Sequence, residues 1–212
     1  MSEINVVDIY KLDDNYQIQR SPVLAKLDYI FDEELSNDDM HIYYKKLCET
    51  VIIMINGLNA TIYQLVFNLK VDITSIHTIL RYVNDRCVTA KEIYRKINIK
   101  YPFQKQISIG HSLGGTIASK FTSKDSTIYT FNKLIFKPNH DIKNLINFRT
   151  YFDPVSLLTL LFENKYTTNL PFELPNDFNI DVTSLEIVKN IGNLLKKAHY
   201  LQNFKDIKIV IP

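Results

Sequence analysis

The feature that most constrains the fold is a glycine-rich turn at residues 110–114 (GHSLG), which stands between a predicted strand and a predicted helix. Residues 106–109 are short and apolar, as expected of a strand, and residues 116–121 have helical character. In a strand-turn-helix of the form G-x-S-x-G, the serine has a strained backbone, and the residues two before and two after it must be tiny. The order therefore predicts a sharp elbow that lifts the Ser112 hydroxyl clear of a sheet.

Glycine is scarce in this chain, which makes its placement informative. Only 5 glycines occur in 212 residues, where average usage of roughly 7% predicts about fifteen. Three of them, Gly110, Gly114 and Gly115, lie at the turn, and a fourth, Gly57, ends an earlier apolar run. We expect these two loops to face each other across the carboxyl edge of the sheet. The alternative for Ser112 is a helix-capping serine in an ordinary turn between strand and helix.

The other predicted elements continue the alternation of strands and helices. Strands are predicted at 49–55, 126–131, 145–151 and 207–211, and amphipathic helices at 76–97 and from Thr183, where a capping box with Glu186 opens the helix, to Ala198. Residues 1 to about 45 are expected to supply a preceding strand and a wrapping segment, and the last strand to close the sheet. Parallel neighbours require crossover connections, so the pattern predicts a three-layer α/β fold with a mostly parallel sheet flanked by helices.

Composition favours one domain over residues 1–212, because 46% of the residues are hydrophobic and no repeat or Gly/Ser-rich linker is present. A net charge of only +2, without a cluster of basic residues and aromatics, argues against nucleic acid as a partner. Residues 1–50 carry eleven acids and five bases, and residues 51–212 carry twelve acids and twenty bases. We expect the two parts to attract each other within the fold; the alternative is peripheral contact of the basic part with an anionic lipid membrane.

The N-terminal residues carry acids where a secretory signal has a basic start and an apolar run. No apolar stretch approaches the roughly 18 residues that span a bilayer. We therefore expect a soluble, cytoplasmic protein. Cys48 and Cys87 fit reduced thiols better than a disulfide framework, and neither a zinc-type spacing nor a nucleotide-binding loop is present, so no cofactor or metal is expected.

Several motifs together resemble the class 3 (fungal-type) lipase family and its intracellular relatives. The central motif is GHSLGG at 110–115, which follows a long helical pattern and the segment YPFQKQISI at 101–109. After it come a predicted strand at 126–131, the segment FDPVS at 152–156 and the segment AHYLQNF at 198–204. The matching pieces run from about residue 49 to 204; GHSLGG is the strong match, D-P-V is moderately specific and H-x-L-x-N-F is weak. The family consists of α/β-hydrolases that cleave acyl esters of lipids with a Ser-His-Asp triad. The resemblance implies Ser112 as nucleophile, Asp153 as acid and His199 as base.

The residues themselves support these partners. A serine hydroxyl needs a base, whose imidazole needs a carboxylate, and in this fold the chain order is Ser, Asp or Glu, His. Asp153 closely follows a predicted strand, and no histidine follows His199. Each has a structural alternative: Asp153 before a proline is also a helix N-cap, and His199 at a helix end can interact with the terminal carbonyls.

Rival residues fit less well. Histidines that break the chain order are His41, His77 and His140, the last followed by Asp141. His111 adjoins Ser112, but its side chain should leave the elbow in another direction, so we expect a supporting role. Asp177 and Asp181 remain alternative acids.

The expected oxyanion donors are two backbone N–H groups. Leu113 follows the nucleophile directly, and Leu58 lies in the loop after the strand at 49–55. Family members often carry a phenylalanine-arginine-glycine-threonine-like sequence there, whereas this chain has Ile-Asn-Gly-Leu at 55–58, which lacks a hydroxyl to position the loop. Residues 62–67 or 157–162 are expected either to form a hydrophobic lid or to belong to core helices.

The sequence thus predicts a serine hydrolase that cleaves carboxylic esters, of a lipid or lysolipid, through an acyl-enzyme on Ser112. An acyltransferase or a thioesterase would use the same triad, so sequence does not separate them from a lipase. A binding or scaffold protein on a hydrolase fold is the third alternative, motivated by the unusual loop at 56–58 and the weak motif around His199.

Overall fold

The computed structural model describes residues 1–13, 17–58, 62, 73–121, 126–133, 144–150, 153, 167–170, 197 and 199–212. Several predicted features lie outside these residues: the helix from Thr183, the rival residues His140, Asp141, Asp177 and Asp181, and the two lid segments apart from Ile62.

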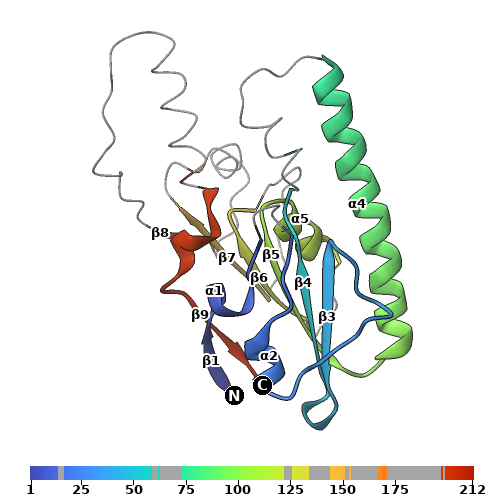
Figure 1. The fold of residues 1–212 in the computed structure, drawn as a ribbon, viewed down its shortest axis with the longest axis vertical. Helices are drawn as coiled ribbons and strands as arrows, with labels where there is room; N and C mark the ends of the chain where they lie inside the picture. The colour runs from blue at the N-terminus through green and yellow to red at the C-terminus, as the bar shows by residue number, and fades with distance from the viewer. Residues whose placement is uncertain are drawn as a thin grey trace.

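Seven strands form the central sheet, in the order β2-β3-β4-β5-β6-β7-β8 (Figure 1). Their bounds are Ile30–Phe31 (β2), Met40–Lys45 (β3), Thr50–Ile55 (β4), Lys105–His111 (β5), Thr127–Phe131 (β6), Leu145–Thr150 (β7) and Thr167–Leu170 (β8). Strands β4 to β8 run parallel to one another, whereas β2 and β3 pair antiparallel. The strands predicted at 49–55, 106–109, 126–131 and 145–151 are confirmed as β4 to β7.

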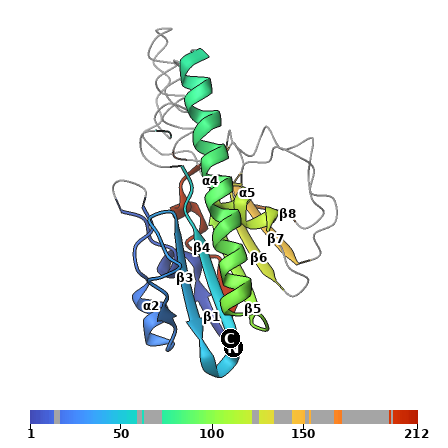
Figure 2. The ribbon, with the colours of Figure 1, turned by 90° about the vertical axis from the view of Figure 1, so that its right-hand side faces the viewer.

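The sheet is covered on both faces. The helices are α1 (Val6–Ile9), α2 (Pro22–Lys26), α4 (Ile73–Lys100) and α5 (Leu113–Lys120), with 3-10 turns η1 (Lys46–Cys48) and η3 (Leu201–Phe204). Along the fully buried β4, Val51, Ile53 and Ile55 pack against α4 and α5, and the alternating Ile52 and Met54 pack against α1 and α2. Figure 2 shows α4 crossing in front of β4 and β5. The predicted fold class, a mostly parallel sheet flanked by helices, is confirmed.

The two chain ends meet in a separate ribbon, which corrects one prediction. Strand β9 (Lys208–Ile211) does not close the central sheet but pairs antiparallel with β1 (Ser2–Asn5). The reason lies in its one-sided pattern, since Ile209 and Ile211 are buried while Lys208 and Val210 are exposed. A strand with one apolar face covers a core, whereas an inner strand of a parallel sheet is buried on both faces.

Helix α4 has 28 residues and extends three residues beyond the predicted span of 76–97 at each end. Its surface toward the sheet carries the expected apolar residues, including Ala90, Tyr94 and Ile97. Within the described residues, no helix is both long enough and apolar enough to span a membrane.

Asp32 ties the loop between β2 and β3 to the end of α4. Its buried carboxylate accepts a hydrogen bond from the Tyr101 hydroxyl at 2.7 Å and forms an ion pair with Lys100 Nζ at 3.0 Å. Burial by itself raises the pKa of Asp32, but the hydrogen bonds from Tyr101, Lys100 and the Leu35 backbone outweigh it, so the pKa is lowered. The charged carboxylate therefore stabilises the fold.

We predict that Asp32→Asn lowers the free energy of unfolding at pH 7 by about 1.5 to 3 kcal/mol, the range for hydrogen bonds to charged groups. Because the pKa of Asp32 is lower in the folded chain than in the unfolded one, its stabilisation is present above the unfolded value, roughly pH 4, and is lost as pH falls through the folded value. Urea unfolding should show the difference from wild type shrinking at pH 3. Glu34→Gln, which removes an exposed partner of the same Lys100, is the matched control and should have a much smaller effect.

Candidate active site

Ser112 lies in a sharp turn between β5 and α5, as the sequence predicted. Its backbone has φ 53° and ψ −123°, a conformation that L-residues other than glycine rarely adopt. Such strain costs of the order of 1 to 3 kcal/mol and persists only where the surrounding structure imposes it. Here the Ser112 N–H donates to the carbonyl of Phe131 on β6 at 2.9 Å, which fixes the turn to the neighbouring strand.

Three glycines make this turn sterically feasible. A Cβ on Gly110 would collide with the Gly114 backbone, and a Cβ on Gly114 would collide with the carbonyl oxygens of Ile55 and Asn56. A Cβ on Gly115 would lie 2.8 Å from the Cβ of Lys133. The start of α5 is therefore in backbone contact with both its own strand and the end of β4, and this contact brings the loop after β4 to the Ser112 turn.

Asp153 and His199 meet beside the turn although they are 46 residues apart in the chain. Nδ1 of His199 lies 2.6 Å from Oδ1 of Asp153, and both side chains are completely buried. Asp153 comes three residues after the last residue of β7, whose neighbour is β6. In a neutral imidazole, Nδ1–H donates to the carboxylate and leaves Nε2 as the acceptor, which is the tautomer that a general base requires.

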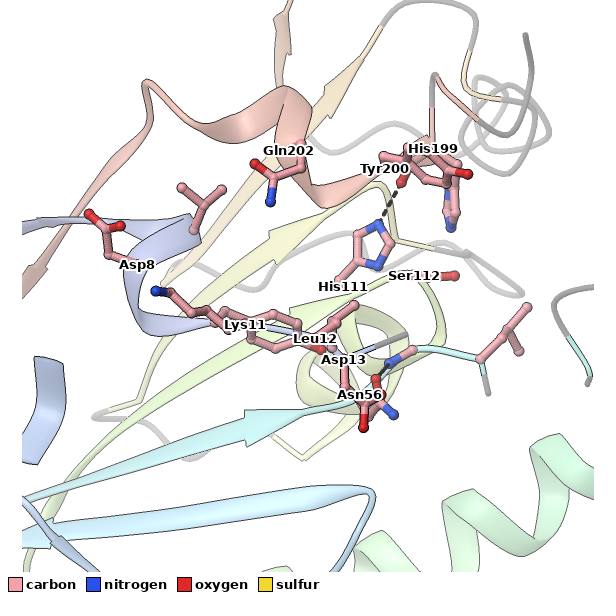
Figure 3. A pocket seen from close by; sticks show the side chains of 14 residues that line it. Asp8, Lys11, Leu12, Asp13, Asn56, His111, Ser112, His199, Tyr200 and Gln202 are labelled. Carbon is pink, nitrogen blue, oxygen red and sulfur yellow. Dashed lines mark hydrogen bonds between the residues drawn. The ribbon is translucent and has the colours of Figure 1, made fainter. Parts of the chain in front are cut away.

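A cavity of about 690 Å³ lies at the carboxyl edge of the sheet. It is lined by Val7, Asp8, Tyr10, Lys11, Leu12, Asp13, Asn56, Gly57, Leu58, His111, Ser112, His199, Tyr200 and Gln202 (Figure 3). The expected nucleophile and base, Ser112 and His199, thus border one cavity. The Ser112 hydroxyl makes no hydrogen bond within the described part of the chain. Catalytic hydrogen bonds are often long in the absence of substrate and tighten only in the reacting complex.

His111 points away from the Ser112 hydroxyl and supports His199. Its Nε2 lies 2.7 Å from the backbone carbonyl oxygen of His199, drawn as a dashed line in Figure 3, and the two rings are 4.7 Å apart between centroids. Burial, reinforced by the nearby His199, lowers the pKa of His111 to about 3. A carbonyl oxygen only accepts, so the neutral ring must carry its proton on Nε2.

The loop after β4 is held by a buried arginine that the sequence analysis did not single out. Arg86 of α4 donates to the carbonyl oxygens of Asn56 and Gly57, each at 2.8 Å, and its Nε lies 3.0 Å from Oδ2 of Asp39. The sequence does contain a signal, because Arg86 falls on the apolar face of the α4 pattern. A fully buried arginine is rare unless it is paired.

The N-terminal segment supplies one wall of the cavity, a role that its sequence did not indicate. Tyr10, at the end of α1, donates its hydroxyl to the carbonyl of Ile55 at 2.6 Å. This bond links the segment to the end of β4 and leaves Asp8, Lys11 and Asp13 along the cavity. The wrapping segment expected at residues 1–45 therefore contributes to the site.

The described rival histidines lie elsewhere. His41 is within β3, where its ring packs edge-on against Phe31 at 5.1 Å, and His77 is exposed on α4. Neither lines the cavity.

No family model matches this chain, and no curated protein matches its sequence. Among solved structures, a mutant form of MDLA from Penicillium cyclopium is 14% identical, with a TM-score of 0.44 over 84% of this chain and 77% of that one. A fungal lipase is 15% identical, with a TM-score of 0.43 over 81% and 75%. A triacylglycerol lipase from Penicillium expansum is 18% identical, with a TM-score of 0.37 over 68% and 67%. The likeness to fungal lipases that the motifs indicated is thus also found among solved structures.

We predict that Gly114→Ala lowers the free energy of unfolding by about 3 kcal/mol or more, the upper end of the cost of overpacking, or prevents folding. The added Cβ would overlap backbone carbonyls rather than a flexible side chain, so the backbone of α5 or β4 would have to shift at a large cost in stability. Thermal unfolding followed by circular dichroism measures the effect. Lys120→Ala, at an exposed position of the same helix, is the control and should unfold within a few degrees of wild type. A Gly114→Ala protein with wild-type stability would contradict the described contact.

A second prediction concerns the His111 ring, which should stay neutral between pH 5 and 8 with its proton on Nε2. The reason is its burial and the hydrogen bond to the His199 carbonyl. Imidazole ¹⁵N chemical shifts, recorded as a function of pH, report both the charge and the tautomer. Titration of His111 near pH 6.5 would contradict the assignment.

Proposed function

We propose that this protein is a serine hydrolase that cleaves carboxylic esters through an acyl-enzyme on Ser112. The observation that carries the proposal is the short, buried contact between Asp153 and His199 beside the strained serine turn. A buried carboxylate and imidazole are costly to bring together unless their geometry is favourable. Their position at the nucleophile turn supports a catalytic rather than a helix-capping role.

The proposed reaction begins when the Ser112 oxygen attacks the carbonyl carbon of the ester and its proton passes to Nε2 of His199. Asp153 remains ionised, holds the tautomer through Nδ1–H, and stabilises the imidazolium. The substrate carbonyl oxygen becomes an oxyanion, which the backbone N–H groups of Leu113 and Leu58 are proposed to bind. His199 then protonates the leaving alkoxide, and an ester remains on Ser112.

Water completes the cycle by attacking the acyl-enzyme while His199 accepts its proton. The oxyanion forms again and collapses with cleavage of the bond between the acyl carbon and the Ser112 oxygen, and His199 returns the proton to that oxygen, which releases the carboxylic acid and restores the hydroxyl. Each step uses side chains and backbone amides of this chain together with substrate and water.

The expected substrates are acyl esters of lipids or lysolipids. The volume of about 690 Å³ is that of a small-molecule site rather than of an extended surface. Its lining supports this class, because Leu12 and Leu58 offer apolar contacts while Lys11 and Gln202 offer polar ones. In an amphipathic ester, the apolar chain would contact the apolar part of the lining and the polar remainder would contact the polar part.

We predict that a fluorophosphonate probe labels the wild-type protein and that Ser112→Ala abolishes the labelling. Hydrolysis of short p-nitrophenyl esters should fall in parallel, with His199→Gln and Asp153→Asn each reducing kcat by about 10³-fold or more, as in triads of this type. Gel fluorescence and initial rates are the measurements, and Ser119→Ala on α5 is the matched serine control, expected to label normally.

The outcomes separate the alternatives. A well-folded wild-type protein that neither labels nor hydrolyses any ester would support the binding or scaffold alternative and overturn the proposal. Labelling with preferred turnover of thioesters, or turnover that rises when alcohol acceptors are added, would assign the same site to a thioesterase or an acyltransferase.

A further inference from the structure

We propose that Arg86 is a positioning residue for the oxyanion site, acting through the Gly57 carbonyl to orient the backbone N–H of Leu58. This inference rests on the proposed function, because it assigns a role within that same site. Arg86 belongs to α4 and does not line the cavity. It therefore acts on the reaction through the loop and not by contact with the substrate.

The contacts of Arg86 converge on one short loop. Its side chain is only 5% exposed, and its two terminal nitrogens each donate to a carbonyl oxygen of the loop at 2.8 Å, one to Asn56 and one to Gly57. Its Nε pairs with Asp39, whose own backbone carbonyl accepts from the Asn56 N–H at 2.8 Å. Arg86 and Asp39 thus grip the loop at three backbone atoms.

The hydrogen bond from Arg86 to the Gly57 carbonyl also fixes the orientation of the Leu58 N–H, because both groups belong to one peptide unit. The carbonyl of Gly57 and the N–H of Leu58 belong to one peptide unit, and no cis peptide is present among the described residues. In a planar trans peptide, the C=O and N–H bonds point in opposite directions. A guanidinium that draws the Gly57 oxygen toward α4 therefore turns the Leu58 N–H toward the opposite side.

The loop also lies against the Ser112 turn, and the proposal takes this as the side that the Leu58 N–H faces. A Cβ on Gly57 would be only 3.2 Å from the Ser112 Cβ, so the loop is in direct contact with the elbow. Leu58 borders the cavity together with Ser112. The Leu58 N–H makes no hydrogen bond to another described residue, which leaves it available to a substrate oxyanion.

The positive charge strengthens the same N–H group. A cation hydrogen-bonded to a carbonyl oxygen polarises the peptide, and polarised amide groups are better donors in a low-dielectric site. The loop at 56–58 contains no hydroxyl that could hold it. Its only side-chain support from within is Asn56, whose Oδ1 accepts from the Gly57 N–H at 2.8 Å. Arg86 supplies from outside the loop the fixed geometry that a preorganised oxyanion site requires.

The test compares Arg86→Lys with Tyr82→Phe. A lysine keeps the charge but lacks the planar fork, so it cannot hold both carbonyls and Asp39. We expect kcat for a p-nitrophenyl ester to fall about 10- to 100-fold, less than or comparable to the loss of an oxyanion donor, with KM changed little. Tyr82→Phe removes another hydrogen bond of the same guanidinium, at 2.7 Å, without touching the loop, and should leave kcat within about twofold.

Two readouts separate positioning from a general structural effect. The affinity of a trifluoromethyl ketone, which forms a tetrahedral oxyanion adduct with serine, should weaken in Arg86→Lys in proportion to kcat/KM. In Arg86→Ala, millimolar guanidinium should restore part of kcat by occupying the vacated site beside Asp39, whereas ammonium should not. Both effects are absent if Arg86 merely stabilises the fold.

Failure of this inference is distinguishable from failure of the proposed function. If wild type has no Ser112-dependent labelling or turnover, the proposed function fails and this inference with it. If wild type is active and folded Arg86→Lys has wild-type kcat and inhibitor affinity, only this inference is overturned. Should neither variant fold, ¹⁵N-leucine labelling of wild type decides, because the Leu58 amide proton must shift downfield when the adduct forms, and an unchanged signal overturns the proposal.

Discussion

The backbone contact between the start of α5 and the end of β4 is the constraint on which the site depends. Gly114 lies directly against the carbonyl oxygens of Ile55 and Asn56, so the Ser112 turn and the loop after β4 form one unit. No side chain larger than hydrogen fits at this contact. The strain at Ser112 is tolerated because the glycines permit the turn and its N–H is fixed to β6.

Around this unit, buried polar groups form hydrogen bonds with one another. The imidazole of His199 faces Asp153, its backbone carbonyl accepts from His111, and the guanidinium of Arg86 fills the space behind the loop. Each of these groups would be costly to bury alone. Together they form a preorganised set of donors and acceptors at one edge of the sheet, at the cavity that the N-terminal segment closes from the other side.

Elements with a strong local pattern were predictable from the sequence. The β-branched run of β4 and the long amphipathic α4 came out close to their true bounds, because burial on two faces or on one stripe leaves a direct periodic record. Strand β8, with the polar sequence TTNL, has no such record and was not predicted. Strand β9 was found but assigned to the wrong sheet, since a strand's sequence shows its buried faces and not its partner.

The sequence by itself determined the elbow, because scarce glycines around one serine allow few other structures, and it indicated Asp153 and His199 through their order in the chain. Only the tertiary structure decided that these two side chains meet, that His111 supports the His199 backbone, and that Arg86 clamps the loop at 56–58. The physical reason is the distance along the chain over which each interaction acts. Backbone sterics act within a few residues and leave a motif, whereas hydrogen bonds between distant segments depend on how layers pack, which no local pattern records.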